Sequence, residues 1–98
     1  MVKLFMVEFG LPAVFTEDFV RLIPRQRDFV NRLLAEGKIK SYSLAMDRSR
    51  VWVVFAATSE YEVMESIGQF PLVEYMTPNI MELAFHNAHD MVLQFSMN

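Results

Sequence analysis

Two of the predicted strands of this chain are mostly apolar on both faces, and this limits the folds open to its 98 residues. In VKLFMVEF, residues 2–9, one face carries Lys, Phe, Val and Phe, and the other carries Val, Leu, Met and Glu. The segment VWVVFAA, residues 51–57, is apolar on both faces in the same way. An antiparallel sheet normally turns one polar face to water, so these strands require a covering layer on each side.

Hydrophobic periodicity divides the chain into six elements joined by short connections. Strands are expected over residues 2–9, 39–46, 51–57 and 79–85, and the second and third of them flank the polar turn DRSR as a hairpin.

Two helices are expected between these strands. The first has Thr16 as its N-cap and apolar residues at helical spacing up to Gly37, and Pro24 predicts a kink or a fresh first turn inside it. Ser59 and Glu62 form the Ser-x-x-Glu capping box of the second.

The order βαββαβ predicts an α+β fold of the ferredoxin-like plan, with a four-stranded antiparallel sheet and both helices on one face. The chain is expected to form one domain over residues 1–98. No further helix is predicted that could cover the other face, so a second copy of the chain is the expected cover. The resulting two-fold homodimer would form a dimeric α/β barrel, with room between sheet and helices for a small ligand.

Composition argues against several classes of protein. The chain contains no cysteine, which excludes disulfides and thiolate metal sites, and 9 basic against 12 acidic residues give no footprint for nucleic acid. No apolar run approaches the ~18 residues of a membrane helix. The N-terminus does not resemble a signal peptide, so a cytoplasmic protein is expected.

His86 and His89 lack a third ligand held by a common element, so no metal is expected.

One stretch of the sequence carries a family resemblance. The pattern Pro71-Leu72-x-x-Tyr75-Met76, then nine residues, then His86, resembles the C-terminal half of the muconolactone isomerase family. The pairs Arg32-Leu33 and Glu36-Gly37 at the end of the first helix are also similar to it. The resemblance implies a dimeric α/β barrel, often built into larger rings. It also implies an isomerase that needs no cofactor and moves a proton across an unsaturated lactone bearing a carboxylate.

That reaction needs a group that removes a carbon-bound proton and returns it elsewhere, together with a donor for the enolate-like oxygen. His86 suits the acid/base role because imidazole titrates near neutrality, and Tyr75 is the candidate donor. Glu8, in a largely apolar strand, is a third catalytic candidate, because burial would raise its pKa. Each residue also has a purely structural interpretation. His86 would then face solvent, Tyr75 would be a packing residue, and Glu8 would face water at a sheet margin.

Five residues are predicted to contact the substrate: Arg25, Ser41, Ser43, Trp52 and Glu82. Arg25 belongs to a basic group with Arg21 and Arg27 that would hold a carboxylate or simply face solvent. The two serines predict a roomier cavity if they face it.

Two departures from the family make muconolactone itself a doubtful substrate. Glu8 and Phe85 stand where the family carries basic residues, so a less charged unsaturated acid or lactone fits better.

Three functions remain open at this point. The first is proton-transfer isomerisation of such a compound, and the second is a noncatalytic ligand-binding or assembly module on the same barrel. The third, a monooxygenase without cofactor, rests on fold analogy and on Trp52. Residues 87–98 form a tail that either reaches the partner subunit or frays.

Overall fold

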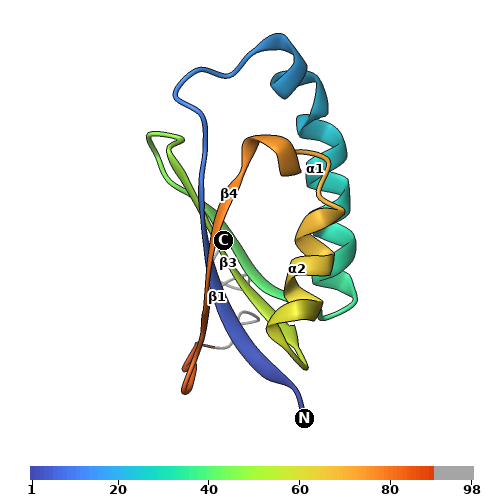
Figure 1. Ribbon diagram of the computed structural model, residues 1–98, viewed down its shortest axis with the longest axis vertical. Coiled ribbons are helices and arrows are strands. Elements are labelled where there is room, and N and C mark those ends of the chain that lie inside the picture. Colours follow the sequence, from blue (N-terminus) through green and yellow to red (C-terminus); the bar gives the residue numbers. More distant parts are fainter. Residues whose placement is uncertain (90–98) are drawn as a thin grey trace.

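The structure, a computed structural model, describes residues 1–89 and contains two helices on one side of a four-stranded sheet (Figure 1). The sheet order is β2-β3-β1-β4 and every neighbouring pair is antiparallel, which confirms the ferredoxin-like prediction. The predicted role of the tail lies largely outside the described residues. The elements are β1 (Lys3–Gly10), α1 (Glu17–Ala35), β2 (Ile39–Leu44), β3 (Arg50–Ala57), α2 (Glu60–Gly68), the short 3-10 helix η1 (Val73–Tyr75) and β4 (Thr77–Glu82).

The core lies between the sheet and the helices and is centred on aromatic side chains. Phe70, just after α2, is buried, and its ring lies 5.7 Å from that of Phe9, 5.8 Å from that of Phe29 and 6.3 Å from that of Phe55. These rings join β1, α1, β3 and the segment after α2. Aromatic pairs at such distances stabilise the fold beyond the contribution of burying their apolar surface.

Helix α1 begins and ends where the sequence predicts. The Thr16 hydroxyl accepts a hydrogen bond from the Phe19 amide at 3.3 Å, and Gly37 has the positive φ of 77° typical of a residue that follows a helix. Pro24 lies inside α1, which runs unbroken from Glu17 to Ala35, so no new helix starts there. Pro24 is exposed, and the buried side chains of α1 lie on another face of the helix. Because that face packs against the sheet on both sides of Pro24, the helix continues through the proline.

Helix α2 has a modified capping box. The Ser59 hydroxyl accepts from the Glu62 amide at 3.2 Å, as predicted. The Glu62 carboxylate accepts from the amide of Thr58 at 3.1 Å and from its hydroxyl at 3.2 Å, one residue before Ser59. Two backbone donors and one hydroxyl at the start of α2 are thereby satisfied.

Strand β4 lies earlier in the sequence than predicted. It spans Thr77–Glu82 in place of 79–85, and Pro78 pairs with Phe9 inside it. A proline is tolerated because β4 is an edge strand, and its outer side forms no hydrogen bonds with another strand of the sheet. His86 therefore lies four residues beyond the strand and does not close it.

The sheet face turned away from the helices carries rows of side chains that run across all four strands. One row is polar at its margins and consists of Ser43, Trp52, Glu8 and Asn79, and the next contains Ser41, Val54, Met6 and Met81. Neither helix covers this face. It is the face for which a second copy was predicted.

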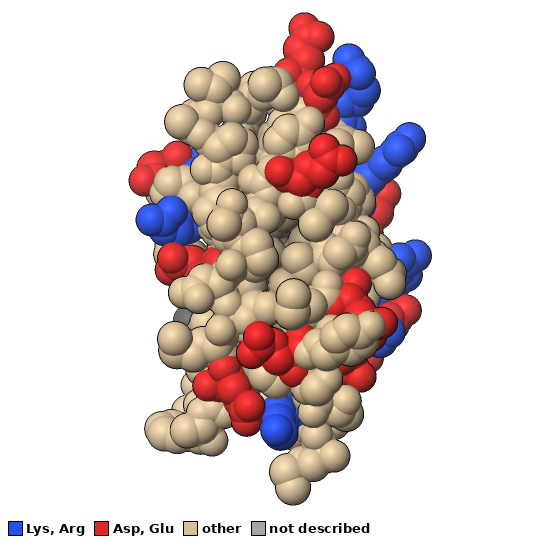
Figure 2. Space-filling view, viewed as in Figure 1, with Lys and Arg blue, Asp and Glu red and all other residues tan. Residues whose placement is uncertain are grey.

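Charged side chains are distributed unevenly over the molecule. In Figure 2 several basic side chains lie along the edge formed by α1, interspersed with acidic ones, and others lie at the opposite edge and near the bottom; a largely uncharged area lies between the two edges. No helix in the described part of the chain combines the length and the apolar character needed to cross a membrane.

Candidate functional site

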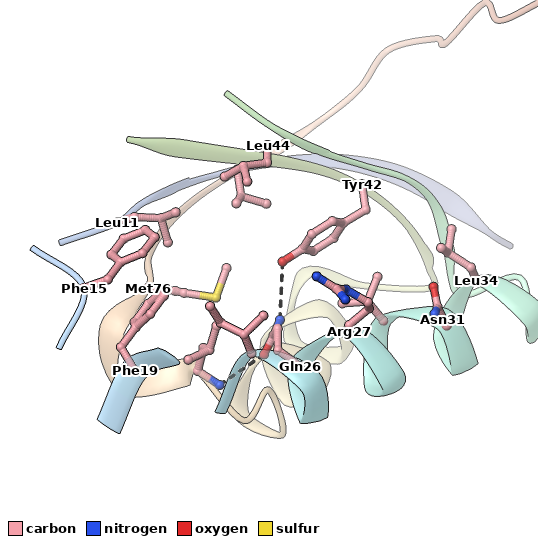
Figure 3. A pocket seen from close by; sticks show the side chains of 14 residues that line it. Leu11, Phe15, Phe19, Gln26, Arg27, Asn31, Leu34, Tyr42, Leu44 and Met76 are labelled. Carbon is pink, nitrogen blue, oxygen red and sulfur yellow. Dashed lines mark hydrogen bonds between the residues drawn. The ribbon is translucent and has the colours of Figure 1, made fainter. Parts of the chain in front are cut away.

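A cavity of about 330 Å³ lies between α1 and the β2–β3 side of the sheet (Figure 3). Its volume is within the range typical of small-molecule sites, roughly 300–1,000 Å³. Most of its lining is apolar, and the four polar residues are Gln26, Arg27, Asn31 and Tyr42. The apolar lining consists of Leu11, Phe15, Phe19, Ile23, Val30, Leu34, Leu44, Val51, Leu72 and Met76.

Gln26 is the one buried polar side chain among the described residues, with 4% of its surface exposed. Its Oε1 accepts a hydrogen bond from the Leu72 amide at 3.1 Å, and its Nε2 donates to the Tyr42 hydroxyl oxygen at 3.5 Å (Figure 3). A backbone N–H can only donate, so it orients the carboxamide oxygen toward Leu72 and the NH₂ group toward Tyr42. Three separate segments are joined through this amide.

Tyr42 is held in its neutral form by its surroundings. Burial raises the pKa of Tyr42 above its ordinary value of about 10, and the hydrogen bond from Gln26 opposes part of that effect. The phenol is therefore a hydrogen-bond donor, not a base, at physiological pH.

The cavity can hold a small apolar molecule that carries an oxygen at one end. Its aromatic and aliphatic walls would contact the carbon skeleton, and the Tyr42 hydroxyl and the Arg27 guanidinium could meet a carbonyl or a carboxylate. None of the lining residues has a carboxylate or an imidazole. A general base for proton abstraction is thus not part of the lining.

Three of the predicted site residues lie together, on the other face of the sheet. Trp52 Nε1 donates to Glu8 Oε1 at 3.0 Å, Arg50 Nε lies 3.4 Å from Glu8 Oε2, and Ser43 pairs with Trp52 across the strands. This cluster is partly exposed and does not line the cavity.

The remaining serine and Glu82 are also away from the cavity. Ser41 lies on the same face as Ser43, while Tyr42, which alternates with them in β2, lines the cavity. Because the serines do not face it, they do not enlarge it. Glu82 is exposed on the edge strand, with its Oε2 3.8 Å from Lys3 Nζ.

Tyr75, His86 and Arg25 are not brought together. Tyr75 is half-buried and its ring meets that of Phe19 edge-on at 5.3 Å, while His86 is exposed beyond β4. Arg25 is exposed on α1, and its neighbour Arg27 is the basic residue that lines the cavity.

Two functional candidates, Gln26 and Tyr42, were not anticipated. Gln26 falls three residues after Ile23 and four before Val30, within the apolar stripe of α1, and a polar residue at a stripe position is the signal that could have identified it. Tyr42 could have been found by assigning the faces of its strand.

Comparison with known proteins agrees with the fold. A sequence model of the family described as muconolactone delta-isomerase matches residues 4–89. A crystal structure of muconolactone isomerase superposes with a TM-score of 0.71 at 22% sequence identity, covering 88% of this chain and 93% of that chain. No curated protein sequence matches significantly. An identity of 22% supports a common fold without fixing a substrate.

Proposed function

The chain belongs to the muconolactone delta-isomerase family, and from this premise we propose that it isomerises a small unsaturated lactone or acid by proton transfer without a cofactor. The observation that carries the proposal is the neutral Tyr42 hydroxyl, held by Gln26 inside an apolar cavity. Removal of a proton from carbon places negative charge on the conjugated oxygen. A preorganised donor at that oxygen lowers the barrier.

In the proposed reaction, a base takes a proton from one ring carbon, the double bond shifts, and the same group delivers a proton to another carbon. Tyr42 donates to the oxygen that becomes enolate-like, and Arg27 is the cation for a substrate carboxylate. No atom is gained or lost overall. The reaction therefore needs only an acid/base group besides the residues of the cavity.

His86 is our candidate for that group, because an imidazole can both accept and donate a proton and His86 ends the motif that resembles the family. His86 is exposed and does not line the cavity of its own chain. Its role therefore requires a second copy that carries its own His86 to the cavity mouth. We propose such a homodimer, with the helix-free sheet faces in contact.

A second candidate function is a noncatalytic ligand-binding module. The specific observation in its favour is the cavity lining, which has a hydrogen-bond donor and a cation but no acid/base group. Such a module would retain a small unsaturated acid without converting it.

An ultraviolet-monitored assay with muconolactone and a panel of unsaturated lactones separates the two candidates. The isomerase proposal expects turnover that is lost in His86→Ala and kept in the matched surface variant His89→Ala. Turnover equal in His86→Ala and the wild type would exclude His86 as the base. No turnover across the panel, together with a small molecule retained in native mass spectra, would favour the binding module.

A further inference from the structure

The polar groups of the cavity are concentrated at one side of it. In Figure 3, Leu11, Phe15, Phe19 and Met76 lie at one end, while Tyr42, Gln26, Arg27 and Asn31 lie toward the other. A ligand that fills this cavity would thus be apolar at one end and polar at the other.

The hydrogen bonds at the polar side have a defined direction. The Leu72 amide donates to Gln26, and Gln26 donates to Tyr42. The oxygen of Tyr42 is therefore already an acceptor, and its own hydrogen is left to donate. Within residues 1–89 Tyr42 forms no hydrogen bond as a donor.

This chain of hydrogen bonds limits which ligands are complementary to the cavity. A donor that is mostly buried gains most from a ligand that offers an acceptor, while a hydrocarbon would leave the hydroxyl hydrogen without a partner. A site built to hydrogen-bond its ligand rejects analogues that lack the matching group.

We propose that Tyr42 determines the ligand specificity of this cavity by donating a hydrogen bond to a carbonyl or carboxylate oxygen, and that Gln26 is the positioning residue that directs it. The proposal rests on the proposed function, because it assigns the substrate class of the same cavity. Lactones and free acids share the acceptor oxygen, so the experiment below includes a probe for each.

The test is an NMR titration of the protein with three five-membered rings. Cyclopentenone carries a carbonyl, cyclopentenecarboxylate carries a carboxylate, and cyclopentene has neither. In Tyr42→Phe we expect affinity for at least one oxygen-bearing probe to fall about five- to tenfold, since a neutral hydrogen bond contributes about 1 kcal/mol. Affinity for cyclopentene should stay within about twofold, because the aromatic ring is kept.

Gln26→Met tests the positioning role. It keeps a side chain of similar length but leaves the Tyr42 hydroxyl without its directing N–H. We expect the affinity for the same oxygen-bearing probe to fall by less than in Tyr42→Phe, and the affinity for cyclopentene to stay unchanged. If Gln26 had a merely structural role, its loss would lower the affinity for all three probes together. The ratio of the affinity for the oxygen-bearing probe to that for cyclopentene therefore distinguishes the two roles.

If Tyr42→Phe folds poorly because the Gln26 NH₂ group loses its acceptor, the double variant Tyr42→Phe/Gln26→Glu supplies the same comparison at low pH, where the carbonyl of the protonated carboxyl group introduced by Gln26→Glu still accepts from the Leu72 amide. The inference is overturned if Tyr42→Phe lowers the affinity for all three probes equally, or changes the affinity for none of them. Turnover of muconolactone that is unaltered in Tyr42→Phe also overturns it but leaves the isomerase proposal standing. Selective loss of oxygen-bearing probes in a protein that turns over no lactone supports the inference and refutes the isomerase.

Discussion

At the scale of single residues, the Gln26 side chain contributes to stability by joining α1 to Leu72 and to Tyr42. Gln26→Met should leave the Leu72 amide buried without an acceptor and lower the free energy of unfolding by about 1–3 kcal/mol. Urea denaturation measures the change. The matched control is Arg25→Met, on the exposed side of the same helix, which should differ from wild type by less than about 0.5 kcal/mol. Equal effects of the two would show that the buried amide adds nothing specific.

The raised pKa of Tyr42 predicts a stability that falls at high pH. Because burial raises its pKa in the folded state, the folded protein holds the phenolic proton above pH 10 where the unfolded chain releases it. The free energy of unfolding should therefore decline as the pH rises through about 10, and Tyr42→Phe should remove that part of the decline. Denaturation at pH 9 and pH 11 checks this. A parallel decline in both proteins would assign it to other groups.

The residues of the site could be only partly predicted from the sequence. Glu8 and Trp52 were named separately and do form a hydrogen bond, yet on the sheet face opposite the cavity. Both faces of β1 are apolar, so alternation alone could not assign Glu8 to one of them. Tyr42 was not anticipated, because Ser41 and Ser43, which have the opposite parity in the same strand, were the residues predicted to face the cavity.

At the scale of elements, α1 contains a proline that costs it stability. Pro24 offers no N–H to the carbonyl of Val20, yet α1 continues through it. We expect Pro24→Ala to raise the free energy of unfolding by about 1–3 kcal/mol, because it restores one hydrogen bond at an exposed position. Thermal unfolding followed by circular dichroism measures the gain. Val20→Ala, on the exposed face, controls for added helix propensity, and a decrease in Pro24→Ala would mean that Pro24 contributes to packing more than its missing hydrogen bond costs.

The number, type and order of the main elements were predictable because caps and periodicity are local signals. The Thr16 cap, Gly37 and the Ser59 cap all have the predicted roles. The limits of β4 were not predictable, because a proline commonly precedes a strand, while the place of Pro78 at a sheet edge lets the strand include it. That shift of the strand end left His86 outside the sheet.

At the scale of the whole molecule, the helix-free sheet face is the proposed dimer interface. Met81 lies on this face and is 62% exposed. Met81→Asp should place a charge in the proposed contact and shift the protein toward monomer in size-exclusion chromatography with light scattering. Met64→Asp, on α2 and 56% exposed, is the control and should keep the wild-type mass. A monomeric wild type would rule out the proposed homodimer.

The bond between Gln26 and Leu72 has a consequence for how the cavity can be observed. The Leu72 backbone N–H donates to a side chain of the cavity and not to a backbone carbonyl of a strand or helix. The rate at which this hydrogen exchanges with deuterium therefore depends on how often its hydrogen bond to Gln26 breaks. A ligand that holds Tyr42 and Gln26 in place should slow exchange at this one amide more than elsewhere. Leu72 would then report occupancy of the cavity without any label on the ligand.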